Sequence, residues 1–457
     1  MSTHPLPAPA AAPVPPEHER QAYVEQVRAD GTDYDLLNIG GLDMWSATGY
    51  QQAKQLLTDP RVVNSPSPVT GRENDVDLFA LGPTLTGRHV LRADGTAHAR
   101  LRATIAPAFS RAAVLRRRAF ITRTVERLLD GLPGTDETDL VESFARPLVN
   151  HVLGHAMGLT EDQTRRHAVL QRRNSDATDA TTQRRTAFAL SILLQRVLSG
   201  SEGAIPQDSL MASMLRPPRA ITPLSYAEAV ENLIAVYRAG LIPTISALAF
   251  GAARLAQEQS PQAMTALQDP GRTEILIEEL LRLQPPHAVT TPRVTAEPIE
   301  TDNGIIPRGS TVTACLVTAN RDRVQYTAPD EMRLDRTRPP KHLAFGWGPH
   351  SCVGAVLARQ ILHLALPALF GRYPRLRLTL PLEEIRFHGS YSDRIPIALP
   401  VVLDTPAQPS PALAAASSGL VTIATLGPAV GHTPSAAERD LGAVRSVQTR
   451  TSQVAQS

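Results

Sequence analysis

The spacing of apolar residues along the chain predicts a mostly helical protein. Apolar positions recur three and four residues apart, the period of an amphipathic helix. The period appears in residues 98–130, 138–158, 161–199, 224–258, 272–284 and 353–372. Strand patterns are shorter and come late, at 292–296, 309–317 and 395–403. The pattern therefore predicts a mainly α fold with a small β portion, and no internal repeat divides it.

The two ends of the chain lack this periodicity. Residues 1–18 are rich in Pro and Ala, and residues 405–457 are mainly Ala, Ser, Thr and Pro with scattered charge. Segments of this composition cannot bury enough apolar surface to fold. We therefore expect two disordered tails on either side of one domain, residues 19–404.

Composition and charge narrow the class of protein. The 457 residues carry 46 basic and 44 acidic side chains, a net charge of +2, which leaves no broad basic face for nucleic acid. The first twenty residues do not form a signal peptide, and no eighteen apolar residues run together without charge or Pro, so we expect no membrane association. Two cysteines, Cys315 and Cys352, cannot form a disulfide framework. These features are typical of a cytoplasmic protein, which we expect to be a monomer that binds a small molecule.

The segment around Cys352 carries the strongest chemical signal. It reads Phe-Gly-Trp-Gly-Pro-His-Ser-Cys-Val-Gly over residues 345–354, and an apolar helical stretch follows. The glycines let the backbone turn tightly. A cysteine at a helix N-terminus gains thiolate character, which suits a soft ligand for iron. An inert buried cysteine is the simpler interpretation of a lone Cys, and the flanking pattern argues against it. A dinucleotide-binding loop fails because position 351 is Ser and no hydrophobic strand precedes the glycines.

This segment resembles the haem-binding signature of cytochromes P450, Phe-Gly-x-Gly-x-His-x-Cys-x-Gly, at every fixed position. The resemblance covers roughly residues 20–404 and implies the cytochrome P450 fold with haem b, iron protoporphyrin IX. It implies that Cys352 is the axial iron ligand and that Phe345, Gly346 and His350 bind the cofactor. Thiolate ligation pushes electron density onto the iron and favours cleavage of the O–O bond of dioxygen. The implied activity is that of a monooxygenase.

Further matches lie upstream of the cysteine. Glu279-Leu-Leu-Arg282 is similar to the family's Glu-x-x-Arg helix, in which a buried ion pair braces the core behind the haem. Arg293 resembles the strand arginine that contacts a haem propionate, and His98 with Arg102 resembles the helical propionate pair. Each match alone is weak, because such ion pairs also occur on solvated helices. Their order along the chain gives them weight.

The chain departs from the family on the long helix that covers the haem. The family signature there is Ala-Gly-x-(Asp/Glu)-Thr-(Thr/Ser), and this sequence reads Ala-Gly-Leu-Ile-Pro-Thr over residues 239–244. Ala239 and Gly240 remain as the oxygen groove, but Ile242 replaces the acid and Pro243 replaces the threonine. Thr244 is the remaining hydroxyl for a catalytic role, displaced by one residue.

Two interpretations of this departure stay open. Pro243 bends a core helix, and water or substrate carries the proton. Alternatively, oxygen transfer is poorly supported and substrate radicals couple, which forms C–C, C–N or C–O bonds in an aromatic or cyclic-dipeptide-like metabolite. The first outcome is hydroxylation and the second is oxidative coupling; both fit a secondary-metabolite enzyme.

The resemblance also implies substrate contacts and partners. Substrate-binding positions are expected at Leu85, Thr86, Val289, Thr290 and Tyr391. The sequence contains no flavin or iron–sulfur domain, so electrons from NAD(P)H should arrive through a ferredoxin and a ferredoxin reductase. Arg111, Arg116, Arg117 and Arg118 form either a docking surface for the ferredoxin or a solvated helix face. A catalytically silent P450-like partner that activates another biosynthetic enzyme remains the alternative function, although such relatives typically lack the ligand cysteine.

Overall fold

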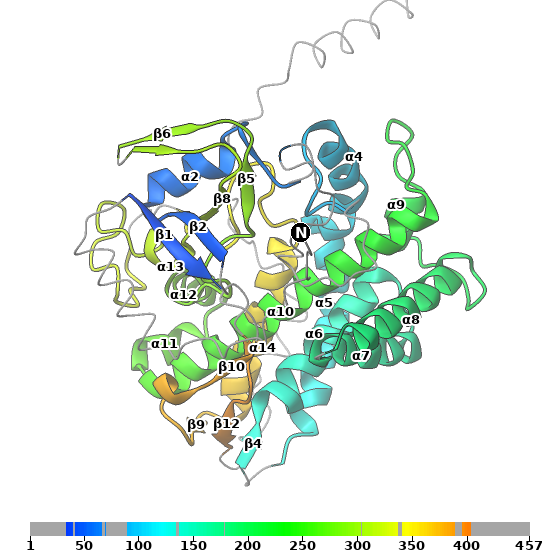
Figure 1. Cartoon of the computed structure of the whole chain (residues 1–457). Helices are drawn as coiled ribbons and strands as arrows, with labels where there is room; N and C mark the ends of the chain where they lie inside the picture. The colour runs from blue at the N-terminus through cyan, green and yellow to red at the C-terminus, as the bar shows by residue number, and fades with distance from the viewer. Residues whose placement is uncertain are drawn as a thin grey trace, which may run out of the picture. The chain divides into compact units, whose positions relative to one another are not determined.

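The computed structural model describes residues 33–39, 42–65, 69, 89–133, 137–177, 179–302, 304–336, 341–388 and 395–403. The chain divides into two units, Met1–Gly419 and Leu420–Ser457, and every described residue belongs to the first. The tails expected at 1–18 and 405–457 lie outside the described residues. Figure 1 traces the described elements in chain order.

Helices dominate the described part of the chain, which confirms the predicted fold class. The helices are α2 (Tyr50–Thr58), α4 (Gly95–Ile105), α5 (Arg111–Asp130), α6 (Arg146–Met157), α7 (Glu161–Asp176), α8 (Ala180–Leu198), α9 (Leu210–Leu215), α10 (Tyr226–Glu258), α11 (Pro261–Ala266), α12 (Pro270–Leu283), α13 (Leu316–Ala319) and α14 (Ala355–Arg372). Short helical turns add Ala106–Phe109, Val141–Ala145 and Leu382–Glu384.

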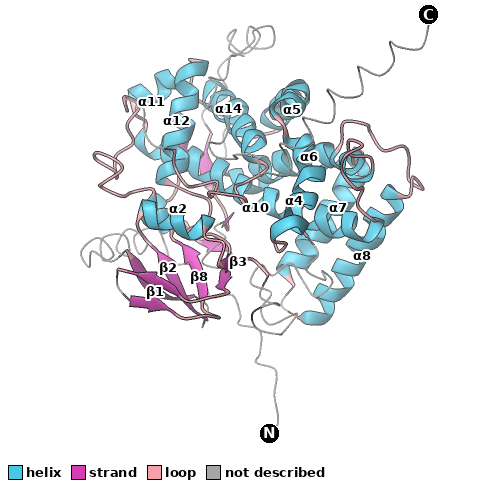
Figure 2. Cartoon of the chain, turned by 90° about the horizontal axis from the view of Figure 1, so that it is seen from above, coloured by secondary structure: helices cyan, strands magenta, loops and turns pink. Residues whose placement is uncertain are grey.

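The largest sheet has five strands in the order β1-β2-β8-β5-β3. Its strands are β1 (Tyr34–Ile39), β2 (Leu42–Ala47), β3 (Val62–Val63), β5 (Arg293–Thr295) and β8 (Thr311–Ala314). The pairing is antiparallel except between β2 and β8, where Trp45 lies opposite Val312 in parallel. Figure 2 shows that this sheet and α2 lie together on one side of the helical bundle.

Three smaller sheets contain the other strands of the described residues. Their members are β4 (Glu137–Asp139), β12 (Pro400–Val402) and β9 (Arg377–Leu378), then β10 (Phe387–His388) with β11 (Ile395–Pro396), and β6 (Ile299–Thr301) with β7 (Gly304–Ile306).

Helix α10 runs through the centre of the helical region (Figure 1). It begins at a capping box, in which the Ser225 hydroxyl accepts from the Glu228 N–H and the Glu228 carboxylate accepts from the Ser225 N–H. By length and composition it is apolar enough to cross a membrane, but 67% of its most apolar window is buried inside the protein. Burial on nearly all sides explains an apolar helix of this length as a core element.

Several segments that the sequence predicts as one helix or strand form two elements in the structure. The stretch 98–130 becomes α4 and α5, because Pro107 starts a tight turn and the Ser110 hydroxyl accepts from the Ala113 N–H to begin a new helix. The stretch 161–199 is two helices, the second capped by Asp179. The predicted strand 309–317 ends at Ala314, and the Ala319 N–H donates to the Cys315 carbonyl to form the short helix α13. The predicted strand 395–403 is likewise divided, into β11 and β12.

Candidate functional site

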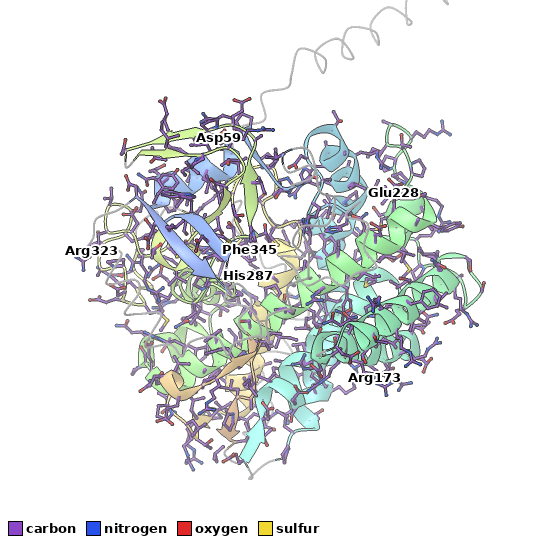
Figure 3. All side chains as sticks on the ribbon, viewed as in Figure 1. Asp59, Arg173, Glu228, His287, Arg323 and Phe345 are labelled. Carbon is purple, nitrogen blue, oxygen red and sulfur yellow. The ribbon has the colours of Figure 1, made fainter. Side chains whose placement is uncertain are left out.

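A cavity of about 280 Å³ lies between α10, the N-terminal part of α14 and the loop before it, and β5. Most of its wall is apolar, and among the described residues that line it there is no Asp or Glu. Its charged and ionisable members are His98, Arg102, Arg238, His287, Arg293, His350 and Cys352. Figure 3 labels His287 and Phe345, two lining residues from different parts of the chain.

The cysteine loop is fixed by backbone hydrogen bonds. The Cys352 N–H donates to the Phe345 carbonyl at 2.8 Å, and the Gly346 N–H donates to the Leu343 carbonyl at 2.8 Å. Gly346 and Gly348 have φ angles of +67° and +75°, a conformation that favours glycine. At Gly348 a Cβ would also lie 3.0 Å from the Leu57 carbonyl oxygen, so the loop packs directly on the end of α2.

Cys352 itself opens onto this cavity, three residues before α14 begins at Ala355. Burial raises the pKa of its thiol, whereas the N–H groups of Gly354 and Ala355 and the charges of Arg102 and Arg359 lower it. The N–H groups at the start of α14 and the two arginines therefore act in the expected direction, toward the thiolate, and burial acts against them. A metal that binds this sulfur displaces the proton.

Four cationic or hydrogen-bonding residues cluster beside the cysteine. His98 on α4 stacks on His350 with ring centroids 3.8 Å apart. The Arg102 Nη1 donates to the Ser351 carbonyl at 2.9 Å, and the Arg293 Nη1 donates to the Leu57 carbonyl at 3.1 Å. Burial lowers the pKa of His98 to about 4 and that of Arg293 to about 10.

This cluster fits the two carboxylates of a haem. The Nε2 of His98 and the Nε of Arg293 are buried without a hydrogen-bond partner, and such groups call for a ligand or a water. Among the described residues, no group of three or more His, Cys, Asp and Glu is placed to hold a bare metal ion. One sulfur donor beside a cationic cluster would suit the iron of a haem, whose other ligands come from the porphyrin and not from the protein.

Two residues that sequence reasoning did not assign hold this cluster in place. Asp94 accepts from the backbone N–H groups of Asn64 and Ser65 at 2.9 Å each, and its Oδ1 lies 3.7 Å from the His350 Nε2. The Asn64 side-chain nitrogen lies 2.9 Å from the same ring nitrogen. Burial raises the pKa of Asp94, but hydrogen bonds from His350, Asn64 and Ser65 outweigh it and lower the value to about 2. Asn64 is far from any recognisable motif, so the sequence offered no signal for it.

Glu279 and Arg282 lie behind the cysteine loop as a buried pair. The Arg282 Nε donates to Glu279 Oε1 at 2.8 Å, and its Nη2 donates to Oε2 at 2.9 Å. Arg282 also donates to the carbonyls of Asn320 and Glu331. Arg336 adds a second buried guanidinium, 3.1 Å from Glu279 Oε2. Because Arg336 stands in an irregular segment, its role was not apparent from the sequence.

Helix α10 forms one wall of the cavity, and the unusual sequence at residues 239–244 lies on this wall. Ala239, Gly240, Ile242, Pro243 and Thr244 all line it, and the helix continues through Pro243 without a break. Proline has no N–H, so the carbonyl of Ala239 lacks its usual partner four residues on. This wall therefore offers a backbone acceptor and a threonine hydroxyl, but no carboxylate.

The expected substrate positions are only partly described. Val289 and Thr290 line the cavity, whereas Leu85, Thr86 and Tyr391 lie outside the described residues. The Thr290 hydroxyl accepts from the Ala314 N–H at 3.0 Å and lies 3.1 Å from the Thr313 hydroxyl, so it already takes part in the sheet. Arg238 and His287 also line the cavity and had no motif to identify them.

The arginine cluster proposed for docking is not one surface. Arg111 and Arg116 are exposed, but Arg117 is only 2% exposed. Its Nη1 donates to the Ala108 carbonyl at 2.6 Å and its Nη2 to the Asp208 carbonyl at 2.5 Å. The assignment of Arg117 to a docking face was therefore wrong, because Arg117 lies on the side of α5 that is buried in the core.

Comparisons with known proteins agree with this geometry. The family model described as Cytochrome P450 matches residues 204–375. The chain is 32% identical over 373 residues to Cytochrome P450 107B1 of Saccharopolyspora erythraea, covering 80% of this chain and 91% of that one. It is 30% identical to the Cytochrome P450 monooxygenase PikC of Streptomyces venezuelae, covering 82% and 89%. A solved structure titled as the P450 enzyme CxnD for C–S bond formation in chuangxinmycin biosynthesis superposes with a TM-score of 0.75 at 26% identity, covering 89% and 100%.

Proposed function

Because this chain belongs to the cytochrome P450 family, we propose that it is a haem-thiolate monooxygenase or oxidase of a secondary metabolite, with Cys352 as the axial ligand. The chain is an enzyme that oxidises a small molecule, as its relatives are. The observation that carries the residue assignment is the opening of Cys352 and the cluster of His98, Arg102, Arg293 and His350 onto one cavity.

Several residues in and behind this cavity would hold the haem or support the residues that do. When bound, the haem supplies activation of dioxygen and one-electron oxidation of the substrate. His98, Arg102 and Arg293 bind its carboxylates, and Phe345 and Gly346 shape the pocket around the sulfur. Glu279 and Arg282 brace the loop from behind. Apolar lining excludes bulk water from the substrate.

The reaction outcome depends on how protons enter. The side chains of Ile242 and Pro243 carry no exchangeable proton, so we assign proton delivery to the Thr244 hydroxyl, to cavity water held by the Ala239 carbonyl, or to the substrate itself. Hydroxylation and oxidative coupling are both compatible with this wall. Turnover under ¹⁸O-labelled dioxygen separates them, because one labelled atom in the product identifies hydroxylation and none identifies coupling.

The electron source and the cellular location are proposed here from the resemblance to the family. We propose that NAD(P)H supplies electrons through a ferredoxin and its reductase, and that the exposed Arg111 and Arg116 contribute to docking an acidic partner. We further propose a monomer in the cytoplasm. Weaker reduction of an Arg111→Gln/Arg116→Gln variant, with the shortfall removed at high salt, supports this docking site.

The decisive experiment is the carbon monoxide difference spectrum of the reduced protein. We expect a strongly red-shifted Soret band in the wild type and its loss in Cys352→Ser. Cys315→Ser is the matched control, because Cys315 is buried and is not among the residues that line the cavity. Its replacement should therefore keep the band. A folded, haem-loaded wild type without the band rejects this function and favours the silent-partner alternative.

A further inference from the structure

A charged cluster lies outside the cavity, where α12 and α14 lie side by side (Figure 2). Arg359 on α14 makes two hydrogen bonds to one carboxylate of α12. Its Nε donates to Glu278 Oε1 at 2.6 Å, and its Nη2 donates to Oε2 at 2.7 Å. The Nε2 of His342 lies 3.2 Å from the same Oε2. None of these three is among the described residues that line the cavity, so the cluster is separate from the groups assigned to the haem carboxylates.

The contacts of Glu278 keep its carboxylate charged and fix the guanidinium of Arg359. Burial raises the pKa of Glu278, but the hydrogen bonds and charges of Arg359 and His342 outweigh it and hold the pKa well below its usual range. Two parallel N–H donors on one carboxylate determine the plane of the guanidinium as well as its position. The side chains of Arg359 and Glu278 are 29% and 30% exposed, so water screens the pair only in part.

This orientation places the guanidinium over an aromatic ring of the cysteine loop. The Arg359 Cζ lies 4.3 Å from the centroid of the Phe345 ring, within the range of a cation–π contact. Phe345, which Figure 3 labels, lines the cavity, and its carbonyl accepts from the Cys352 N–H at 2.8 Å. Arg359 therefore contacts the residue that holds the backbone of Cys352.

The charge of Arg359 also acts on the Cys352 sulfur. Arg359 and Arg102 are the two arginines whose charges favour the thiolate there. Arg102 lines the cavity, whereas Arg359 acts on the sulfur from within the protein. A positive charge near a metal centre stabilises the form that carries one more electron, and groups around the ligands of a metal adjust its reduction potential in this way.

We propose that Arg359 raises the reduction potential of the haem that Cys352 binds, and that Glu278 is the positioning residue that holds Arg359 over Phe345. This inference rests on the proposed function and adds how its site accepts an electron. With the guanidinium in place, the iron takes up an electron from the external donor more readily. Without the carboxylate of Glu278, the partly exposed Arg359 side chain turns its charged end toward water.

The test is a redox titration of the haem-loaded protein, followed by its Soret band. We expect Arg359→Gln to raise the ratio of ferric to ferrous protein about tenfold at a fixed potential, which lowers the reduction potential by about 59 mV for a one-electron couple. Arg359→Lys keeps the charge but not the two parallel donors, so it should recover part of the difference. Arg372→Gln is the matched control, because Arg372 ends the same helix and pairs with Asp130 away from the cavity. It should leave the potential unchanged.

Glu278→Gln separates positioning from net charge. Loss of a negative charge alone would raise the potential, whereas a guanidinium no longer held over Phe345 lowers it, so we expect the same direction as in Arg359→Gln. An unchanged potential in either variant, or a rise in Glu278→Gln, overturns the inference. If Arg359→Gln retains no haem, Arg359→Lys and Glu278→Gln are compared with the wild type, and equal potentials in all three overturn it. With the carbon monoxide band present in these proteins, the proposed function stands without the inference; its absence in the wild type rejects the proposed function itself.

Discussion

The imidazole of His98 lies flat against that of His350, with the two ring planes 30° apart. One ring comes from α4 and the other from the cysteine loop, so the stack joins two walls of the cavity. The His98 Nε2 is buried and has no hydrogen-bond partner. His98 therefore contributes two separate features, a packing contact with the His350 ring and a buried nitrogen that has no hydrogen-bond partner in the protein.

Replacing His98 by Phe separates these two features. The stacked ring remains, but the nitrogen is lost, so we expect the free energy of unfolding to stay nearly constant while haem is released roughly tenfold faster. Transfer of haem to excess apomyoglobin measures the release. His155→Phe is the control, because His155 stacks on Phe120 in the same way, 3.9 Å between centroids, outside the cavity. Equal haem release in both variants contradicts a role of His98 toward the propionates.

Glu279→Gln tests the buried network behind the loop. The substitution leaves the guanidinium groups of Arg282 and Arg336 buried without the carboxylate they share. We expect a loss of about 3–5 kcal/mol in the free energy of unfolding, measured by urea titration. Glu161→Gln breaks an exposed pair with Arg127 and should change the stability little. A similar small effect at Glu279 is the result that contradicts this prediction.

The sequence predicted the structural features that depend on residues close together in the chain. The positive φ angles of Gly346 and Gly348, the pair Glu279–Arg282 and the long helix α10 are each determined by residues a few positions apart. Features that depend on tertiary contacts were missed. Asn64 reaches His350 across 286 positions, and Arg117 is buried only because α5 packs against the segment that carries Asp208.

The acid stability of the protein should depend on His167. This side chain is 0% exposed, contacts the Tyr237 ring and has no hydrogen-bond partner on either nitrogen. Burial lowers its pKa to about 4, so the unfolded chain takes up the proton first as the pH falls. Stability is therefore complete above about pH 6.5 and is lost between about 6.5 and 4, by on the order of 3 kcal/mol. Urea titrations at pH 7.5 and 5.0 should show a smaller difference in His167→Leu; an unchanged difference contradicts the assignment.

Pro243→Ala should stabilise the protein and alter the reaction. The new N–H can donate to the Ala239 carbonyl, and we expect a gain of about 1–3 kcal/mol in the free energy of unfolding. Because that carbonyl then no longer binds cavity water, the share of NAD(P)H electrons recovered in product should change. Pro367→Ala, inside α14 and away from the cavity, should give the stability gain alone. Unchanged electron recovery in Pro243→Ala removes the carbonyl from the proton path.

Alanine should have different effects at two glycines of the cysteine loop: at Gly348 it should lower the folding stability, and at Gly354 it should lower haem uptake. At Gly348 a Cβ would lie 2.8 Å from the Thr58 Cγ2 and 3.0 Å from the Leu57 carbonyl oxygen, in a backbone with φ +75°. Gly348→Ala should therefore cost about 2 kcal/mol or more of folding free energy. Thr58→Ser removes the Cγ2 contact and should restore part of it.

At Gly354 the outcome should be the reverse, because its φ angle is −85° and a Cβ there would meet only the Cys352 sulfur, at the ordinary distance of 3.9 Å. Gly354→Ala should leave urea unfolding within about 0.5 kcal/mol of the wild type. The added methyl group occupies the space beside the sulfur where the cofactor must approach, so haem uptake should fall and the carbon monoxide band should weaken. A Gly354→Ala protein that takes up haem as well as the wild type contradicts the placement of the cofactor on this side of Cys352.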